Sequence, residues 1–415
     1  MQKVWPLNYT NSELCKVRTI TTFITLTADR ETWQSEITKA AQLCTQLASK
    51  CQEKNYQVQS IRIVTNAFGE YLSLESLTTA REGLNYLSEL LHQTNQSGLR
   101  VRFAIGEAKT AAEIALLPQL ISEFGDLCNA CVNVPIDQYC VLDNELILEC
   151  AKAVKQISKI TARGEGNFNF TVNFNCAPHI PYFPASYHDK SIANSFVIGL
   201  ETPDLLVHAL QSVILKVGQT HREVTKDYFI AMSTALQYHI AEIAKIVDHS
   251  ELDSGWYFAG FDSSAAPSKD CASMAQIYQL LGVPYFGASG TVEASALLTK
   301  VFKSITDVDL VGFSGLMLAL TEDRGLAQGS IDDQFDIRSL LTYSAVCGIG
   351  LDTVPIPGDT TIDKMAALMR DTGTMAFRLN KPLTVRVFPV PGLSAGEMTA
   401  FESDDLCNCK VLAVP

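Results

Sequence analysis

Polar and apolar side chains alternate along residues 167–176, which read Asn-Phe-Asn-Phe-Thr-Val-Asn-Phe-Asn-Cys. Successive side chains of a β-strand point to opposite faces, so one face of this strand carries only amides and a hydroxyl, while the other is apolar. A parallel strand covered by helices on both faces should be hydrophobic throughout. Strand-centre amides can orient the polar groups of a ligand, which makes Asn173 and Asn175 candidate substrate-binding residues.

Three arginines occupy the polar faces of other strand-like segments: Arg62, Arg102 and Arg386. A guanidinium group can hold a carboxylate or a phosphate through two parallel hydrogen bonds. Together with the asparagines, these residues predict a site for a small anionic metabolite.

Candidate acid–base groups lie near the ends of strand-like segments. Glu201 ends the segment 195–201 on its polar face, and Asp262 ends the segment 256–262. A carboxylate at the end of a strand is well placed for acid–base work. By contrast, Glu322 and Asp323 follow Thr321 as first-turn carboxylates often do, and we expect them only to stabilise the start of a helix.

A proline-stiffened loop follows the asparagine-rich strand. Residues 177–188 carry three prolines, and two of the titratable side chains there are Tyr187 and His188. Loops at the carboxyl ends of barrel strands often form active sites, and imidazole titrates near neutral pH. The alternative, a connection whose aromatic rings simply pack under a neighbour, is equally consistent with the sequence. We take His188, Glu201 and Asp262 as the candidate catalytic residues, and we assign Tyr187 to substrate binding.

Familiar chemical signatures are missing from the sequence. It contains no Gly-x-Ser-x-Gly elbow and no His-Glu-x-x-His motif. The twelve cysteines have no paired zinc-ligand spacing and are expected to be reduced, mostly buried thiols. No metal and no cofactor is predicted.

The order of the elements predicts an α/β fold. Strand-like runs cover residues 16–27, 58–65, 99–106, 127–134 and 168–175, and later ones cover 255–261, 351–356 and 383–388. Apolar residues recur every three to four positions between the early runs, as in amphipathic helices. Strand, helix and strand at this spacing indicate parallel strands joined by crossovers. Nothing marks a sharp domain boundary, so we expect one unit over residues 1–415, with halves of about 1–178 and 179–415 sharing a core.

The polar strand faces leave two architectures open. Helices could cover one face of an open sheet while water covers the other. Alternatively, the sheet could close into a barrel too wide for side chains to fill, with a polar lumen that holds a ligand. Asparagine, arginine and glutamate at strand centres favour the wide barrel.

Composition limits the partners. The formal charge of −13 argues against binding to nucleic acid or to an anionic membrane. No apolar run reaches the roughly 18 residues of a membrane helix. The first residues have no signal-peptide hydrophobic region, so a cytoplasmic location is expected. Because only 19% of residues are charged and 47% are hydrophobic, we expect a homo-oligomer, most simply a homodimer.

Five stretches in the second half of the chain match the motifs of one known family in order. They are Pro181-Tyr-Phe-Pro-Ala-Ser-Tyr-His188, Ala259-Gly-Phe-Asp-Ser-Ser-Ala-Ala-Pro267, Val311-Gly-Phe-Ser-Gly-Leu-Met-Leu318, Tyr343-Ser-Ala-Val-Cys-Gly-Ile-Gly-Leu-Asp-Thr-Val-Pro-Ile-Pro-Gly-Asp359 and Phe388-Pro-Val-Pro-Gly392. The chain resembles, nearly end to end, the "PFL family protein" group, an uncharacterised domain-of-unknown-function family of bacteria and archaea. Members are described as similar in fold to pyruvate formate-lyase, so the resemblance implies an α/β barrel of about ten strands, built from two five-stranded halves.

The resemblance does not extend to radical chemistry. Glycyl-radical enzymes carry an Arg-Val-x-Gly-aromatic motif near the C-terminus, and the nearest match here places Pro389 where the radical glycine would stand. We therefore predict a non-radical enzyme of lyase or hydrolase type that acts on a small anionic metabolite. The alternative is a non-catalytic protein that binds or senses such a metabolite.

Overall fold

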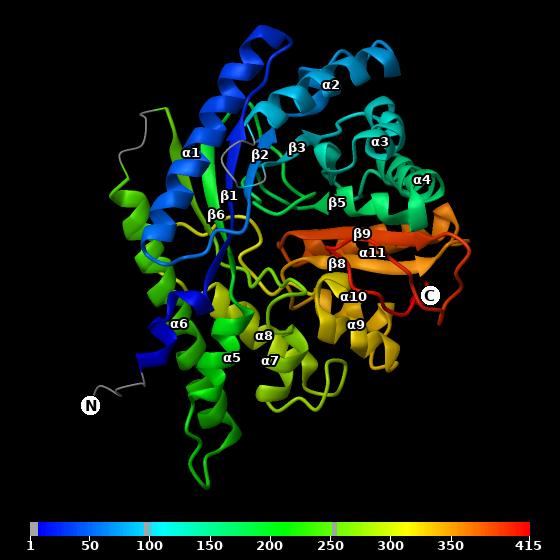
Figure 1. The fold of residues 1–415 in the computed structure, drawn as a ribbon. Helices are drawn as coiled ribbons and strands as arrows, with labels where there is room; N and C mark the ends of the chain where they lie inside the picture. The colour runs from blue at the N-terminus through cyan, green and yellow to red at the C-terminus, as the bar shows by residue number, and fades with distance from the viewer. Residues whose placement is uncertain (1–6, 95–98, 100, 251–254) are drawn as a thin grey trace.

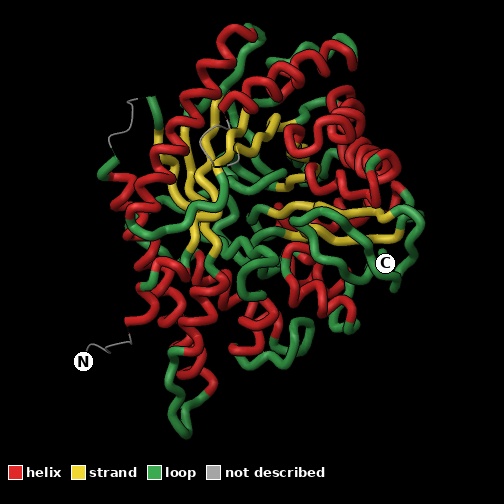
Figure 2. The backbone as a smooth tube through the Cα atoms, viewed as in Figure 1, coloured by secondary structure: helices red, strands yellow, loops and turns green. Residues whose placement is uncertain are grey.

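The computed structural model describes residues 7–94, 99, 101–250 and 255–415. Its centre is a nine-stranded sheet in the order β7-β6-β1-β2-β3-β4-β5-β9-β8 (Figures 1 and 2). The strands are β1 Lys16–Ile24, β2 Ile61–Thr65, β3 Val101–Glu107, β4 Asn129–Val134, β5 Phe170–Phe174, β6 Ser195–Glu201, β7 Tyr257–Asp262, β8 Gly350–Pro357 and β9 Leu383–Val390. The predicted α/β class is confirmed.

Helices surround the sheet (Figure 1). They are α1 Trp33–Glu53, α2 Leu77–Thr94, α3 Ala111–Phe124, α4 Asn144–Ile160, α5 Pro203–Gln211, α6 His221–Asp248, α7 Met274–Leu280, α8 Thr291–Phe302, α9 Arg324–Ile331, α10 Ile337–Ser344 and α11 Ile362–Arg378. In α1, buried residues recur at three and four positions and pack against β1 and β2. Reciprocal capping boxes begin α3, at Thr110 and Glu113, and α6, at Thr220 and Glu223.

The strands run in two opposed sets. Strands β1 to β5 are parallel, as the spacing of the sequence predicted, and α1 to α4 join them. Strand β6 is antiparallel to β1, and β9 is antiparallel to β5. Because β7 is parallel to β6 and β8 is parallel to β9, these four strands all run against the first five. The two sets correspond to the two halves of the chain.

An irregular segment, residues 310–319, spans the two edges of the sheet. Leu310 forms a single parallel bridge with Phe261 of β7, and Ala319 forms another with Asp352 of β8. The segment therefore occupies the position between β7 and β8 where the expected barrel of about ten strands would have its last strand. We call it the closing segment.

The inner face of the curled sheet is largely filled. Phe23, Val64, Ala104, Val197 and Ala259 form a small apolar cluster there, separate from the main core between sheet and helices. The loop that follows β5 and the C-terminal residues cover other parts of the same face: Pro181 accepts a hydrogen bond from Thr21 of β1, and Phe401 packs on Phe388 of β9.

Burial decides between the two architectures that the sequence left open. Thr171 is 2% exposed and Asn173 is fully buried, although both lie on the polar face of β5. A water-covered open sheet is therefore wrong for this strand.

Within the described residues, no helix combines the length and the apolar character needed to cross a bilayer.

Candidate functional site

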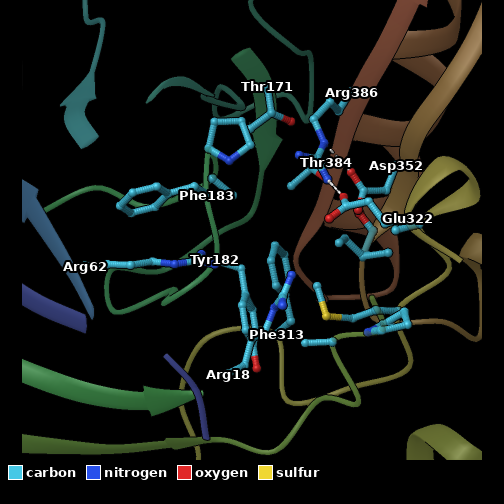
Figure 3. A pocket seen from close by; sticks show the side chains of 17 residues that line it. Arg18, Arg62, Thr171, Tyr182, Phe183, Phe313, Glu322, Asp352, Thr384 and Arg386 are labelled. Atoms are coloured by element: carbon cyan, nitrogen blue, oxygen red, sulfur yellow. Dashed lines mark hydrogen bonds and ion pairs between the residues drawn. The ribbon is translucent and has the colours of Figure 1, made fainter. Parts of the chain in front are cut away.

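A small charged cavity remains on the inner face of the sheet, and strands of both sets contribute to it (Figure 3). Its volume is about 50 Å³. Since one water needs roughly 10–15 Å³ measured in this way, the space suits a few waters or one small anion. The polar lining residues are Arg18, Arg62, Thr171, Glu322, Asp352, Thr384 and Arg386.

Arg62 is the unusual residue of this cavity. Its side chain comes from β2, and the residue is 6% exposed. One guanidinium nitrogen donates to the carbonyl of Pro181 at 3.2 Å, and the group lies 4.9 Å from the ring centre of Phe183. Its Nε has no partner, and among the described residues no carboxylate pairs with it. Burial and the positive charges of Arg18 and Arg102 lower the pKa of Arg62 to about 9, so the group is still charged at neutral pH.

Arg386 of β9 is, by contrast, doubly paired. Its Nε donates to Asp352 Oδ1 at 2.6 Å, and its Nη2 donates to Glu322 Oε1 at 2.5 Å. A weaker contact of 3.4 Å reaches the carbonyl of Phe168. Burial raises the pKa of Glu322, although the positive charge of Arg386 opposes the shift. We call Glu322, Asp352 and Arg386 the carboxylate wall of the cavity.

Arg18 lies between the cavity and its mouth. It donates to Gln59 at 2.9 Å and lies 3.6 Å from the carboxylate of Glu201. A second hollow of about 310 Å³ shares Arg18 and Glu322 with the cavity, and Asp404 and Asp405 of the C-terminal region also line it. The shared residues make this hollow the natural entrance.

The three predicted catalytic residues lie outside the cavity lining. Glu201 is buried at the end of β6, where it pairs with Lys16 at 3.0 Å and with Arg18. Asp262 is buried at the end of β7 and accepts the backbone N–H groups of Phe313 at 2.8 Å and Ser314 at 3.1 Å. Burial raises the pKa of Asp262 to about 6. This carboxylate anchors the closing segment.

His188 lies beside the inner apolar cluster. It is 1% exposed, its ring centre is 6.4 Å from that of Phe23, and neither ring nitrogen has a partner. Burial, reinforced by nearby His179, lowers the pKa of His188 to about 4. The ring is therefore neutral at physiological pH.

Of the six predicted binding residues, the structure brings Arg62 and Arg386 together at the cavity. Arg102 instead pairs with Asp405 at 3.1 Å, near the entrance. Asn173 donates to the carbonyl of Ala185 at 3.0 Å, and so holds the loop that lines the cavity. Asn175 donates to Asn380, and the Tyr187 hydroxyl donates to the carbonyl of Cys176. These last four residues therefore lie outside the cavity lining.

Two lining carboxylates were missed at the sequence level. Asp323 is the N-cap of α9, as expected, but Glu322 one residue earlier lies in the cavity. Asp352 lies within β8 and on no obvious motif of catalytic residues. The available signal was charge within a buried strand: an acidic side chain in the middle of β8 requires a partner.

A metal centre is not apparent in the described part of the chain, where no group of three or more histidine, cysteine or acidic side chains is arranged to hold an ion. The two wall carboxylates converge on Arg386 instead.

The curled sheet and the charged cavity together define a barrel-like α/β protein with an interior polar site. The chain belongs to the family described as "Uncharacterised ACR (DUF711)", whose model matches residues 8–403.

Curated relatives are named UPF0210 proteins. A "UPF0210 protein" of Pyrobaculum arsenaticum is 29% identical over 253 residues, 59% of this chain and 55% of the relative. One from Listeria monocytogenes is 25% identical over 296 residues, 69% of this chain and 63% of the relative. The matches thus span less than two thirds of each relative. A solved structure, the anaerobic ribonucleotide reductase from Thermotoga maritima with citrate in the active site, has a TM-score of 0.41 and 8% identity over 89% of this chain and 80% of its own.

Proposed function

We propose that the cavity binds a small anionic metabolite through Arg62, and that the protein is a non-radical enzyme of lyase or hydrolase type. The observation that carries the proposal is the buried guanidinium of Arg62, which faces the cavity without a carboxylate partner in the described chain. An unpaired buried charge is costly to folding. A bound anion would pair with this guanidinium and offset that cost.

The size of the cavity limits the ligand. A volume of about 50 Å³ suits inorganic phosphate or a carboxylic acid of a few carbons, and not a nucleotide. Access past Arg18 suits the same class, since a cation at the entrance attracts anions.

Glu322 supports an enzyme over a simple binding protein. Lyases and hydrolases both need a group that moves a proton, and the most effective catalytic groups have a pKa near the working pH. Burial raises the pKa of Glu322 toward that range, and the group lies in the lining of the same cavity as Arg62. Glu322 is thus the proposed acid–base residue, in place of His188, Glu201 and Asp262.

The alternative, a non-catalytic metabolite-binding protein, is favoured by the engagement of Glu322 with Arg386. On that view, the carboxylate only fixes the arginine, and ligand binding requires no proton transfer.

The test is incubation of the purified full chain with a small-molecule cell extract, followed by mass spectrometry of both the solution and the protein. An enzyme consumes at least one small acid, whereas a binding protein retains one unchanged. Arg62→Gln should abolish either result, while Arg222→Gln, which changes an exposed arginine of α6, should not. No consumption and no retention of any small anion by the wild-type chain would overturn the proposal.

A further inference from the structure

Opposite charges face each other across the cavity. Arg62 enters from one side, and the carboxylate wall lies on the other (Figure 3). We infer that the ligand is a small carboxylic acid that also carries a hydrogen-bond donor, either a hydroxyl or an ammonium group. The inference rests on the proposed function and specifies its ligand class.

The acid group of the ligand is expected to bind at Arg62. Arg62 lines the cavity, it is buried, and its Nε has no hydrogen-bond partner among the described residues. A carboxylate placed there would gain a charge-assisted hydrogen bond and would neutralise a buried cation.

The carboxylate wall needs donors. Arg386 donates to one oxygen of Asp352 and to one oxygen of Glu322. The second oxygen of each carboxylate accepts no hydrogen bond from the described residues, although both side chains line the cavity. A carboxylate has about four acceptor sites, so this wall has spare capacity for a ligand hydroxyl or ammonium group.

The charge of the carboxylate wall favours a donor on the ligand. Two carboxylates oppose one guanidinium in the wall, which leaves about one negative charge when both are ionised. Arg18, the third lining cation, is turned toward Gln59 and Glu201. A plain carboxylic acid would satisfy Arg62 but would leave the wall without donors; a hydroxy or amino acid satisfies both sides.

The lining also includes apolar side chains. Phe183, Phe313 and Met317 belong to the lining and cannot bond to a polar group in the middle of a ligand. The acid and the donor should therefore be joined by a short carbon skeleton.

The experiment compares three acids that share one skeleton: propanoate, lactate (2-hydroxypropanoate) and alanine (2-aminopropanoate). Calorimetric titration of the full chain at pH 7 should show lactate or alanine binding at least about tenfold more tightly than propanoate, because a site built for a donor penalises its absence. If lactate binds more tightly than alanine, the donor is a hydroxyl group; if alanine binds more tightly, it is an ammonium group.

Glu322→Gln tests the origin of that preference. It keeps the shape of the side chain but replaces an acceptor oxygen by an amide NH₂, so the preference over propanoate should fall to about threefold or less while propanoate binding changes by less than about twofold. Glu145→Gln, on the exposed face of α4, is the matched control. Circular dichroism and thermal melting establish that both variants fold. Asp352→Asn, which replaces an acceptor oxygen of the other wall carboxylate, is used if Glu322→Gln does not fold.

The outcomes separate the inference from the proposed function. Equal affinity of the three acids, with Arg62→Gln eliminating all binding, would overturn the inference and leave the anion site intact. A preference that persists in Glu322→Gln would also overturn it. Binding of none of the three acids, or binding that Arg62→Gln does not weaken, would overturn both.

Discussion

Arg62 is expected to serve binding at the expense of stability. The guanidinium is buried with one backbone acceptor and an aromatic neighbour, Phe183, but no ion partner among the described residues. Replacing a poorly paired buried charge by an apolar side chain of similar length is often neutral or stabilising. We therefore predict that Arg62→Met changes the free energy of unfolding by between zero and about +2 kcal/mol, as measured by urea denaturation.

The control for this prediction is Arg386→Met. That substitution leaves Glu322 and Asp352 buried without their shared cation, and it should destabilise the protein by about 3–5 kcal/mol. If Arg62→Met is as destabilising as Arg386→Met, Arg62 is a structural ion-pair residue and our account of it is wrong.

His188 should make the protein sensitive to acid. Burial lowers its folded-state pKa to about 4, below the ordinary value of 6.5, so the unfolded chain binds the proton more readily. Stability from this group is complete above pH 6.5 and falls as the pH drops toward 4. Between pH 7.5 and pH 5, the expected loss is about 2 kcal/mol.

The measurement is urea unfolding at those two pH values for the wild type and His188→Leu. Between pH 7.5 and pH 5, the free energy of unfolding of His188→Leu should fall by about 2 kcal/mol less than that of the wild type, because leucine cannot take up a proton. His179, Asp189 and Glu70 also act on this histidine electrostatically. An identical pH dependence in the two proteins would show that His188 is not the sensitive group.

At the residue scale, the sequence predicted part of the site. Strand alternation placed Arg62 and Arg386 on polar faces, and the structure brings them to one cavity. The pattern could not show that Arg102 lies near the entrance with Asp405, because that contact joins β3 to a distant C-terminal residue. Glu322 was taken for a helix-start carboxylate because local rules describe its neighbour Asp323 well, and the fold turns the two side chains to different environments.

At the scale of elements, the closing segment is the most demanding part of the fold. Gly312 has a positive φ of 61°, and a Cβ there would lie 2.2 Å from Asp262 Oδ2, the atom that accepts the N–H of Phe313. We predict that Gly312→Ala lowers the free energy of unfolding by about 3 kcal/mol or more, since it adds a collision and a broken buried hydrogen bond to backbone strain.

Gly396→Ala is the matched control. That glycine also has a positive φ, 90°, but no atom lies within 4 Å of its Cβ position. Only the backbone strain remains, so the expected loss is about 1 kcal/mol. Equal losses for the two variants would mean that contact with Asp262 does not matter.

Periodicity predicted the strands well and the closure poorly. Parallel β1 to β5 follow from the regular alternation of strand and helix patterns in residues 16–175. The closing segment has no strand pattern, because two single bridges and the carboxylate of Asp262 hold it instead of a ladder. The sequence also could not predict that loops fill the inner face, because a loop that packs inward has no periodic pattern of apolar residues.

At the scale of the whole molecule, we expect a homodimer. The basis is the low charged fraction, 19%, and the high hydrophobic fraction, 47%. Light scattering at micromolar concentration should give a mass of about twice 45.4 kDa. A mass of 45.4 kDa at that concentration would contradict the expectation.

The central claim is that Arg62 holds a small acid in the cavity on the inner face of the sheet. It is tested most directly by a crystal structure of the protein after exposure to a small-molecule cell extract, with mass spectrometry of the bound compound. We predict density for a carboxylate or phosphate within hydrogen-bond distance of the Arg62 guanidinium group, at about 2.7–3.0 Å. A bound metabolite located elsewhere, with Arg62 paired to a protein carboxylate or solvated by water alone, would contradict the claim.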